Sequence, residues 1–289
     1  MPKNKSNHRE VELVVISDVH LGVHGCHAEE LLKYLKSIQP KKVILNGDII
    51  DIWQFKKRYW PKAHMKIIKH IISWITNGVP VYYITGNHDE MLRKFVGFNI
   101  NSFHIVNKVV LNLDGKKAWF FHGDVFDVTM QHSKWLTKLG AVGYDVLIRL
   151  NQVVNAVSQF FGKGRISLSK KIKNSVKGAV KYINNFEQIA ADIAIENEFD
   201  YVVCGHIHQP TIKTYTNNSG QTLYLNSGDW IENLTALEYH QSKWSIYTFN
   251  DAHYKDAKMK DEKEIDETDK SNKEIFNALL AEFNLMKSQ

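Results

Sequence analysis

The sequence contains few cysteines and no long apolar run. Only Cys26 and Cys204 occur among 289 residues, which is too sparse for a disulfide-stabilised secreted scaffold and favours a reducing compartment. No stretch approaches the roughly 18 consecutive apolar residues of a membrane-spanning helix. The polar start MPKNKSNHRE also lacks the apolar core of a signal peptide. We therefore expect a cytoplasmic protein, with peripheral attachment to the inner membrane as the alternative.

The charge of the chain is concentrated in one region. The composition is ordinary for a globular protein, with 44% hydrophobic and 24% charged residues and a net charge of +6. Between Asp124 and Phe186 there are ten Lys or Arg and three Asp, a net charge of +7, so the rest of the chain is close to neutral. An anionic partner is therefore expected to bind this region.

The first part of the chain alternates between strand-like and helix-like segments. Strands are predicted at residues 11–17, 43–46 and 79–85, with helices at 28–38 and 63–76 between them. This order predicts a parallel sheet with helices on its faces. A hairpin is predicted next, from strands at 109–113 and 117–121 joined by Asp114-Gly115.

The pattern changes after this hairpin. Residues 125–197 have amphipathic segments and no strand signal, which predicts a helical insertion. A strand at 199–204 and a β meander are predicted to follow it. The four strands of the meander are placed at 211–216, 222–226, 234–239 and 244–249.

The C-terminal part is predicted to be a separate tail. Residues 251–272 are dense in Lys, Asp and Glu, which is typical of a solvated linker. Apolar residues at helical spacing between Ile275 and Met286 predict an amphipathic helix. It could dock on its own domain, form a homo-oligomer or contact a membrane surface. We thus expect one domain at 1–250, carrying the insertion, and a tail at 251–289.

Five short segments place metal-binding residue types directly after a predicted strand. In open α/β sheets, sites form at the carboxyl ends of the strands, so these segments should converge. Each motif alone is weak, because Gly-Asp or Gly-Asn is commonly a turn or a helix cap, and their joint occurrence decides the interpretation. The segments are Asp18-Val19-His20, Gly47-Asp48, Gly86-Asn87-His88-Asp89, His122-Gly123-Asp124 and Gly205-His206-Ile207-His208.

Spacing and ligand type indicate a centre of two divalent cations. In Asp18-x-His20 and His206-x-His208 the ligands lie two residues apart, which in an extended backbone directs both to one side. Carboxylate, amide and imidazole suit Mn²⁺, Fe²⁺ or Zn²⁺, and the near absence of thiolate argues against structural zinc. Asp48 can bridge two cations about 3.5–4 Å apart, which would activate water for phosphoryl transfer. We expect manganese, with iron or zinc as alternatives.

The ordered motifs resemble the calcineurin-like metallophosphoesterases over about residues 11–250. This resemblance implies an α/β fold in which two mixed sheets form a four-layer α/β/β/α sandwich. It also implies two ligand sets that share Asp48 as a bridge. The first set would be Asp18, His20, Asp48 and His208, and the second Asp48, Asn87, His122 and His206.

The same resemblance suggests roles for three more residues. His88 would be the catalytic histidine that protonates the leaving oxygen or stabilises charge on the phosphoryl group. Asp51 and Asp89 would lie behind the ligands and orient histidines.

Within the superfamily, the chain looks most like the UDP-2,3-diacylglucosamine hydrolase branch. The features are the helical insertion after His122-Gly123-Asp124 and the run LNSGDWIEN at 225–233. The branch implies cleavage of a pyrophosphate bond in a lipid A precursor, with the insertion as a lid over the acyl chains. The insertion is both basic and apolar, as a lid over an anionic lipid would be. Its candidate substrate contacts are Arg149, Lys170, Lys171 and Lys173.

Two other functions are considered. One is a phosphodiesterase or phosphatase acting on nucleotides or nucleic acid, with the basic insertion on backbone phosphates. The apolar content of the insertion argues against nucleic acid, because nucleic-acid interfaces are more polar. The other is a non-catalytic metal-binding interaction module. The complete set of predicted ligands argues against it. Finally, enzymes of the lipid A branch often carry arginine at the position of His88, which leaves the exact substrate open.

Overall fold

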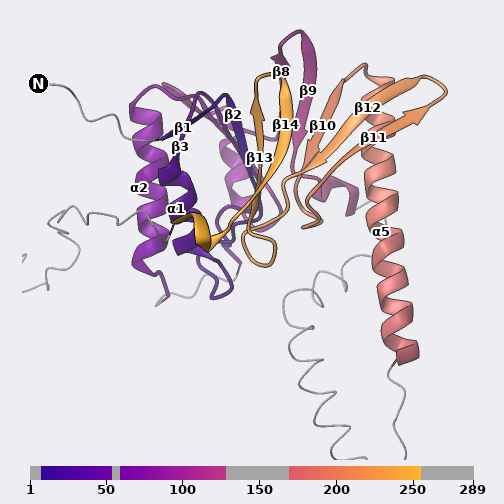
Figure 1. The fold of residues 1–289 in the computed structure, drawn as a ribbon, viewed down its shortest axis with the longest axis horizontal. Coiled ribbons are helices and arrows are strands. Elements are labelled where there is room, and N and C mark those ends of the chain that lie inside the picture. The colour runs from indigo at the N-terminus through magenta and orange to yellow at the C-terminus, as the bar shows by residue number, and fades with distance from the viewer. Residues whose placement is uncertain (1–7, 54–58, 128–168, 255–289) are drawn as a thin grey trace, which may run out of the picture. The chain divides into compact units, whose positions relative to one another are not determined.

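The computed structural model describes residues 8–53, 59–127 and 169–254, without the side chains of 169–181. It confirms the predicted α/β class, because two large mixed sheets make up most of the fold (Figure 1). The predicted C-terminal helix lies outside the described residues, as does the 128–168 part of the insertion. The four-layer order and the lid therefore stay predictions.

The larger sheet has seven strands in the order β14-β13-β2-β4-β5-β7-β6. Strands β2, β4, β5 and β7 run parallel, while β13 pairs antiparallel with β2 and β6 antiparallel with β7. The parallel strands β2 and β4 are buried along their whole length, which explains their uninterrupted apolar sequences. Their bounds are β2 Leu13–Ile16, β4 Val43–Asn46, β5 Val81–Ile84, β6 Asn99–Ile100, β7 Phe103–Val106, β13 Thr235–His240 and β14 Lys243–Thr248.

The smaller sheet has five strands in the order β11-β12-β10-β9-β8. Strands β9, β10 and β12 are parallel, and the two outer strands pair antiparallel with their neighbours. The turn predicted at Asp114-Gly115 joins β8 to β9 as expected. Their bounds are β8 Lys108–Leu113, β9 Lys116–Phe121, β10 Tyr201–Cys204, β11 Thr211–Asn217 and β12 Gly220–Asn226.

A two-stranded parallel sheet and several helices complete the described part. The small sheet pairs β1 (Arg9–Val11) with β3 (Ile38–Pro40). None of the described helices is long and apolar enough to cross a membrane. The α-helices are α1 Ala28–Ser37, α2 Lys62–Thr76 and α5 Ser169–Glu196, and the 3₁₀ helices are η1 Glu90–Phe95, η2 Asp124–Asp127 and η3 Asp251–Tyr254.

Three apolar clusters hold these elements together. The first packs α1 and α2 against one face of the seven-stranded sheet, with Leu31 and Ile67 among its buried residues. The second joins the two sheets, with Ile44 of β4 and Phe120 of β9 among its buried residues. The third packs α5 on the five-stranded sheet around Phe186. Alternate residues of β4 enter different clusters because successive side chains of a strand point to opposite faces.

The predicted β meander is wrong. Strands β11 and β12 form a hairpin in the five-stranded sheet, but β13 and β14 form a hairpin in the seven-stranded sheet. The chain changes sheets after β12, since β13 pairs with β2 from the N-terminal part, opposite Val15. Strands β3, β6 and β7 were not predicted; β7 extends the parallel sheet beside β5.

Candidate metal centre

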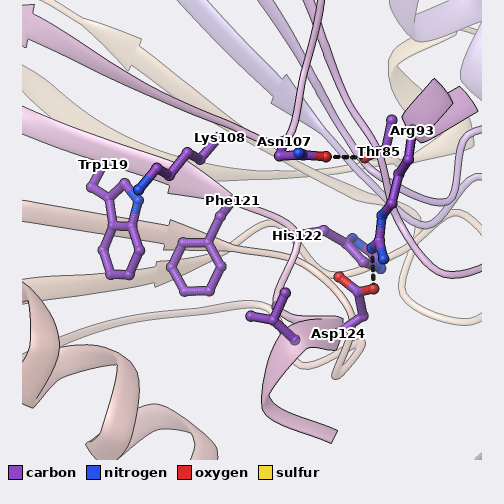
Figure 2. Close-up of a pocket in the computed structure, with 10 residues that line it drawn as sticks. Thr85, Arg93, Asn107, Lys108, Trp119, Phe121, His122 and Asp124 are labelled. Carbon is purple, nitrogen blue, oxygen red and sulfur yellow. Dashed lines mark hydrogen bonds and ion pairs between the residues drawn. The ribbon is translucent and has the colours of Figure 1, made fainter. Parts of the chain in front are cut away.

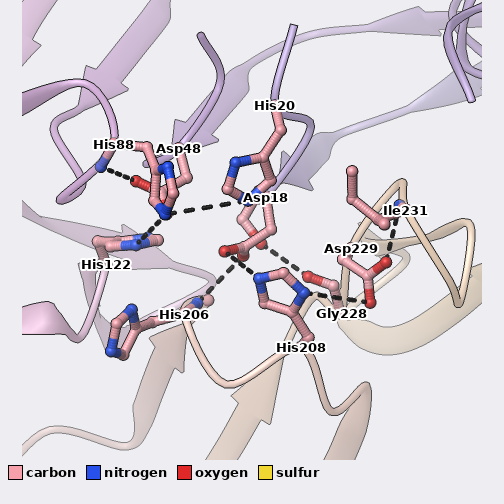
Figure 3. Close-up of polar contacts among 12 residues, drawn as sticks. Asp18, His20, Asp48, His88, His122, His206, His208, Gly228, Asp229 and Ile231 are labelled. Carbon is pink, nitrogen blue, oxygen red and sulfur yellow. Dashed lines mark hydrogen bonds and ion pairs between the residues drawn. The ribbon is translucent and has the colours of Figure 1, made fainter. Parts of the chain in front are cut away.

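The five predicted segments meet at the carboxyl ends of the parallel strands. Figure 3 shows Asp18, His20 and Asp48 from loops after β2 and β4, facing His122, His206 and His208 from loops after β9 and β10. In three groups the potential ligand atoms all lie within 4.8 Å of one another. These groups are Asp18 with His20 and His208, His20 with Asp48 and His88, and Asp48 with His122 and His206.

The backbone brings these side chains together in an unexpected way. Asp18 and His20 have φ values of 52° and 53°, and His206 and His208 have 66° and 52°. The ligand pairs therefore lie on left-handed turns, and the extended backbone assumed for them is wrong. Such a conformation costs about 1–2 kcal/mol for each residue with a Cβ atom. Strain of this kind concentrates at functional sites, where the surrounding structure holds it in place.

Two glycines make room for the ligands. A Cβ atom on Gly47 would lie 2.3 Å from Nδ1 of His122. A Cβ atom on Gly86 would lie 2.2 Å from Oδ1 of Asp48 and 2.7 Å from its backbone nitrogen. Since real Cβ contacts are not this short, a side chain at either position would displace a candidate ligand.

Hydrogen bonds orient two buried histidines of the site so that Nε2 faces it. His122 donates its Nδ1–H to the carbonyl of Asn46 at 2.8 Å, and His20 donates to Oδ2 of Asp51 at 3.3 Å. Because both partners are acceptors, Nδ1 carries a hydrogen in each ring, and Nε2 is the nitrogen left to bind a cation. Four atoms of the predicted ligands are buried without a hydrogen-bond partner among the described residues. They are Oδ1 of Asp18, Nε2 of His20, Oδ1 of Asn87 and Nε2 of His122.

The buried carboxylates of the centre stay ionised and need positive charge beside them. Burial would raise the pKa of Asp18, but the neighbouring His208 outweighs burial and lowers it. Burial would lower the pKa of His208, but Asp18 raises it to about 9, with Oδ1 of Asp18 3.1 Å from Nε2 of the ring. The pKa of Asp48 is lowered in the same way, mainly by His122 against the effect of burial. Buried carboxylates that stay ionised need a cation or a protonated base beside them, so these residues fit divalent metal ions.

Asp51 and Asp89 act at different places behind the ligands. Oδ2 of Asp51 accepts Nδ1–H of both His20, at 3.3 Å, and His88, at 2.8 Å. The carboxylate of Asp89 instead accepts the backbone amides of Ile49 and Gly86. It thus ties two site loops together, and among the described residues it does not orient a histidine as the sequence led us to expect.

Comparison with known proteins identifies the family. The family model described as calcineurin-like phosphoesterase matches residues 11–210. The chain belongs to this family. It is therefore a metallophosphoesterase, a hydrolase.

Relatives of this phosphoesterase include UDP-2,3-diacylglucosamine hydrolases. The one from Aliivibrio fischeri (strain MJ11) is 23% identical over 252 residues, covering 81% of this chain and 97% of the relative. The one from Blochmanniella pennsylvanica (strain BPEN) is 25% identical over 241 residues, covering 82% and 95%. Among solved structures, an archaeal phosphodiesterase matches with a TM-score of 0.39 and 14% identity, over 82% of this chain and 98% of its own.

The structure adds residues to the phosphoesterase site that sequence reasoning missed. His206 lies with Nε2 3.1 Å from Oδ1 of Asp127, and that oxygen also accepts the hydroxyl hydrogen of Tyr182 at 2.6 Å. Asp229 lies with Oδ2 3.9 Å from Nδ1 of His208. The signal for Asp229 was present in the run LNSGDWIEN, whereas the contact of Tyr182 spans 55 residues and has no local signature.

The predicted substrate contacts cannot be placed in the same way. Arg149 lies outside the described residues. Lys170, Lys171 and Lys173 lie on the first turns of α5, where only the course of the helix is described. Their role as substrate contacts stays a prediction.

Proposed function

We propose that this metallophosphoesterase holds two divalent cations and hydrolyses a pyrophosphate or phosphoester bond in an amphipathic substrate, UDP-2,3-diacylglucosamine or a close analogue. The observation that carries the proposal is the cluster of potential ligand atoms that the loops after five strands bring together. Four of the proposed ligands have a buried atom without a hydrogen-bond partner among the described residues. The diacylglucosamine substrate is supported by the relatives, whose names specify it and whose length the chain matches almost fully.

The proposed ligand assignment is supported by two groups of potential ligand atoms, Asp18 with His20 and His208, and Asp48 with His122 and His206. Asp18, His20, Asp48 and His208 would hold one cation, and Asp48, Asn87, His122 and His206 the other; manganese is the proposed metal. When bound, the two cations supply an activated water and neutralise the charge that develops on the phosphoryl oxygens.

One residue of the chain, His88, is placed to protonate the leaving oxygen of the substrate. His88 donates Nδ1–H to Asp51 and its backbone N–H to Oδ1 of Asp48, each at 2.8 Å, so Nε2 is the ring nitrogen left for the substrate. Burial lowers the pKa of His88, but Asp51 and Asp48 outweigh burial and raise it above its ordinary value. A histidine held in its charged form can donate a proton to the leaving oxygen. We therefore assign His88 as the general acid.

The basic, apolar segment at 125–197 is proposed as the lid over the acyl chains, close to a membrane surface. Its charge of +7 between Asp124 and Phe186 suits the phosphates of the substrate. The apolar content of this segment favours the lipid-linked substrate over a nucleic acid, because nucleic-acid interfaces are more polar.

The test is a ³¹P-detected turnover assay of the Mn²⁺-loaded protein with UDP-2,3-diacylglucosamine, ADP-ribose and bis-p-nitrophenyl phosphate. We expect UMP and the acylated sugar phosphate from the first compound. Asp48→Asn should abolish turnover and reduce bound metal, whereas Glu29→Gln, the same change at an exposed position of α1, should alter neither. Hydrolysis of bis-p-nitrophenyl phosphate alone would exclude the lipid substrate, and full activity of Asp48→Asn would exclude the metal centre.

A further inference from the structure

A pocket extends from the metal centre along the edge of the five-stranded sheet. Figure 2 shows His122 at one end, Trp119 at the other, and Asn107 and Phe121 between them. Its volume is about 340 Å³, which is at the lower end of the roughly 300–1,000 Å³ of small-molecule sites. The pocket can therefore hold one group of about the size of a nucleoside. It is too small to hold two acyl chains in addition to that group.

One wall of this pocket is aromatic and rigid. Trp119 and Phe121 are two residues apart on β9, so both side chains lie on the same face of the sheet. Their rings stack with centroids 4.1 Å apart and an interplanar angle of 23°. Phe199 stacks on Trp119 in turn, at 5.6 Å. Packing fixes these rings, and Trp119 and Phe121 both line the pocket, so a flat heterocycle bound there would lie against an aromatic wall.

The polar groups of the pocket are mostly donors. Asn107 accepts the hydroxyl hydrogen of Thr85 on its Oδ1 at 3.0 Å, which leaves its amide N–H₂ as donor. Lys108 lies opposite Phe121 in the β8–β9 register, is exposed, and makes no ion pair with any described residue. Arg93 differs, since its guanidinium is already paired with Asp124. Asn107 and Lys108 are thus available to carbonyl or phosphate oxygens of a ligand.

We propose that this pocket binds the nucleoside of a nucleotide-linked substrate, with a pyrimidine base against Trp119 and Phe121 and its carbonyl oxygens toward Asn107 and Lys108. The inference rests on the proposed function, because it takes the phosphorus to lie at the cation centre beside His122. The long direction of the pocket then places the base away from the reacting bond.

The experiment compares UMP with ribose 5-phosphate as inhibitors of bis-p-nitrophenyl phosphate hydrolysis by the Mn²⁺-loaded full chain. Both inhibitors carry the sugar phosphate, so the ratio of their inhibition constants isolates the contribution of the base. Stacking of a base on an aromatic side chain corresponds to about five- to 150-fold in affinity. We expect UMP to inhibit at least about tenfold more tightly in the wild type.

Variants locate the effect. Trp119→Leu and Lys108→Ala should each bring the ratio toward one, whereas Lys94→Ala, an exposed lysine beside Arg93 that does not line the pocket, should leave the ratio unchanged. If Trp119→Leu does not fold, as judged by circular dichroism, Lys108→Ala carries the test because its side chain is exposed.

The outcomes separate this inference from the proposed function. Equal inhibition by UMP and ribose 5-phosphate in the wild type, alongside turnover of UDP-2,3-diacylglucosamine, would overturn the nucleoside pocket and leave the function standing. A tenfold preference for UMP that both variants remove, without turnover of the lipid, would support the pocket and exclude the lipid substrate. A preference that survives in both variants would place the base elsewhere and overturn the pocket.

Discussion

Asp51 offers a sharp test of how the centre is organised, because one oxygen serves two histidines. Oδ2 of Asp51 accepts Nδ1–H of His20, a candidate ligand, and of His88, the candidate acid. In Asp51→Asn the side chain keeps its size but loses its charge, and its amide cannot accept from both rings if the N–H₂ group faces one of them. We therefore expect one histidine to lose its orienting partner and the other to lose a charge-assisted bond.

The size of the effect can be worked out in two ways. A hydrogen bond to a charged group contributes about 1.5–3 kcal/mol, and every 1.4 kcal/mol corresponds to about a tenfold change in an equilibrium constant. Loss of one such bond thus predicts about a 10- to 150-fold weaker affinity for the cation held by His20. A similar range, about 10- to 100-fold, is typical when the partner behind a metal-binding histidine is removed.

The assay is a Mn²⁺ titration by isothermal calorimetry, followed by kcat at saturating metal with bis-p-nitrophenyl phosphate. We expect weaker binding of one cation and a kcat that stays reduced when metal is saturating, because His88 is misplaced as well. The reasoning would be refuted by a variant in which metal affinity and saturated kcat both stay within twofold of the wild type.

Four further expectations follow from the described contacts. Gly86→Ala should lower activity at least about tenfold, since the new Cβ atom would meet Asp48 at 2.2 Å; normal metal content with normal turnover would contradict this. Asp89→Asn should lower the free energy of unfolding by about 1–3 kcal/mol in urea titrations, because two backbone amides lose a charged acceptor. Burial lowers the pKa of His64, whose Nδ1 accepts the amide hydrogen of Gly22. The neutral ring of His64 therefore contributes fully to stability above the ordinary histidine pKa of about 6.5, and this contribution is lost as pH falls through the lower pKa of the folded state. The free energy of unfolding of His64→Leu should consequently fall less than that of the wild type between pH 7.5 and pH 5. Chelation with EDTA should lower Tm, with about 2.7 kcal/mol lost per site relative to metal at 100 times its Kd; an unchanged Tm would argue against a metal-filled centre.

The parallel strands and the candidate ligands were predictable because their signals are local. A short apolar run followed by Gly-Asp or Gly-Asn identifies a strand and the loop after it, and β4 was predicted with its observed bounds. Ligand type then indicated the chemistry. The left-handed backbone of Asp18 and His206 was not foreseen, because non-glycine residues rarely adopt it and no composition marks it.

The rest depended on contacts between distant parts of the chain. The pairing of Leu237 with Val15 decides that β13 joins the seven-stranded sheet, and nothing near either residue indicates it. Strand β7 was missed because its residues do not alternate and the preceding segment exposes Phe98 and Ile100, which hides the boundary. The hydrogen bond between Tyr182 and Asp127 also depends on distant parts of the chain, since it forms only when α5 packs on its sheet.

The division of the ligands between the two sheets has a consequence for how the protein matures. Asp18, His20, Asp48 and Asn87 follow strands of the seven-stranded sheet, and His122, His206 and His208 follow strands of the five-stranded sheet. Each proposed cation takes ligands from both, and 188 residues separate Asp18 from His206. Neither sheet supplies the complete proposed ligand set of either cation, so we expect metal uptake to follow the docking of the sheets. Cations bound there would hold the two sheets together, and metal supply would then set how much newly made protein is stabilised in this form.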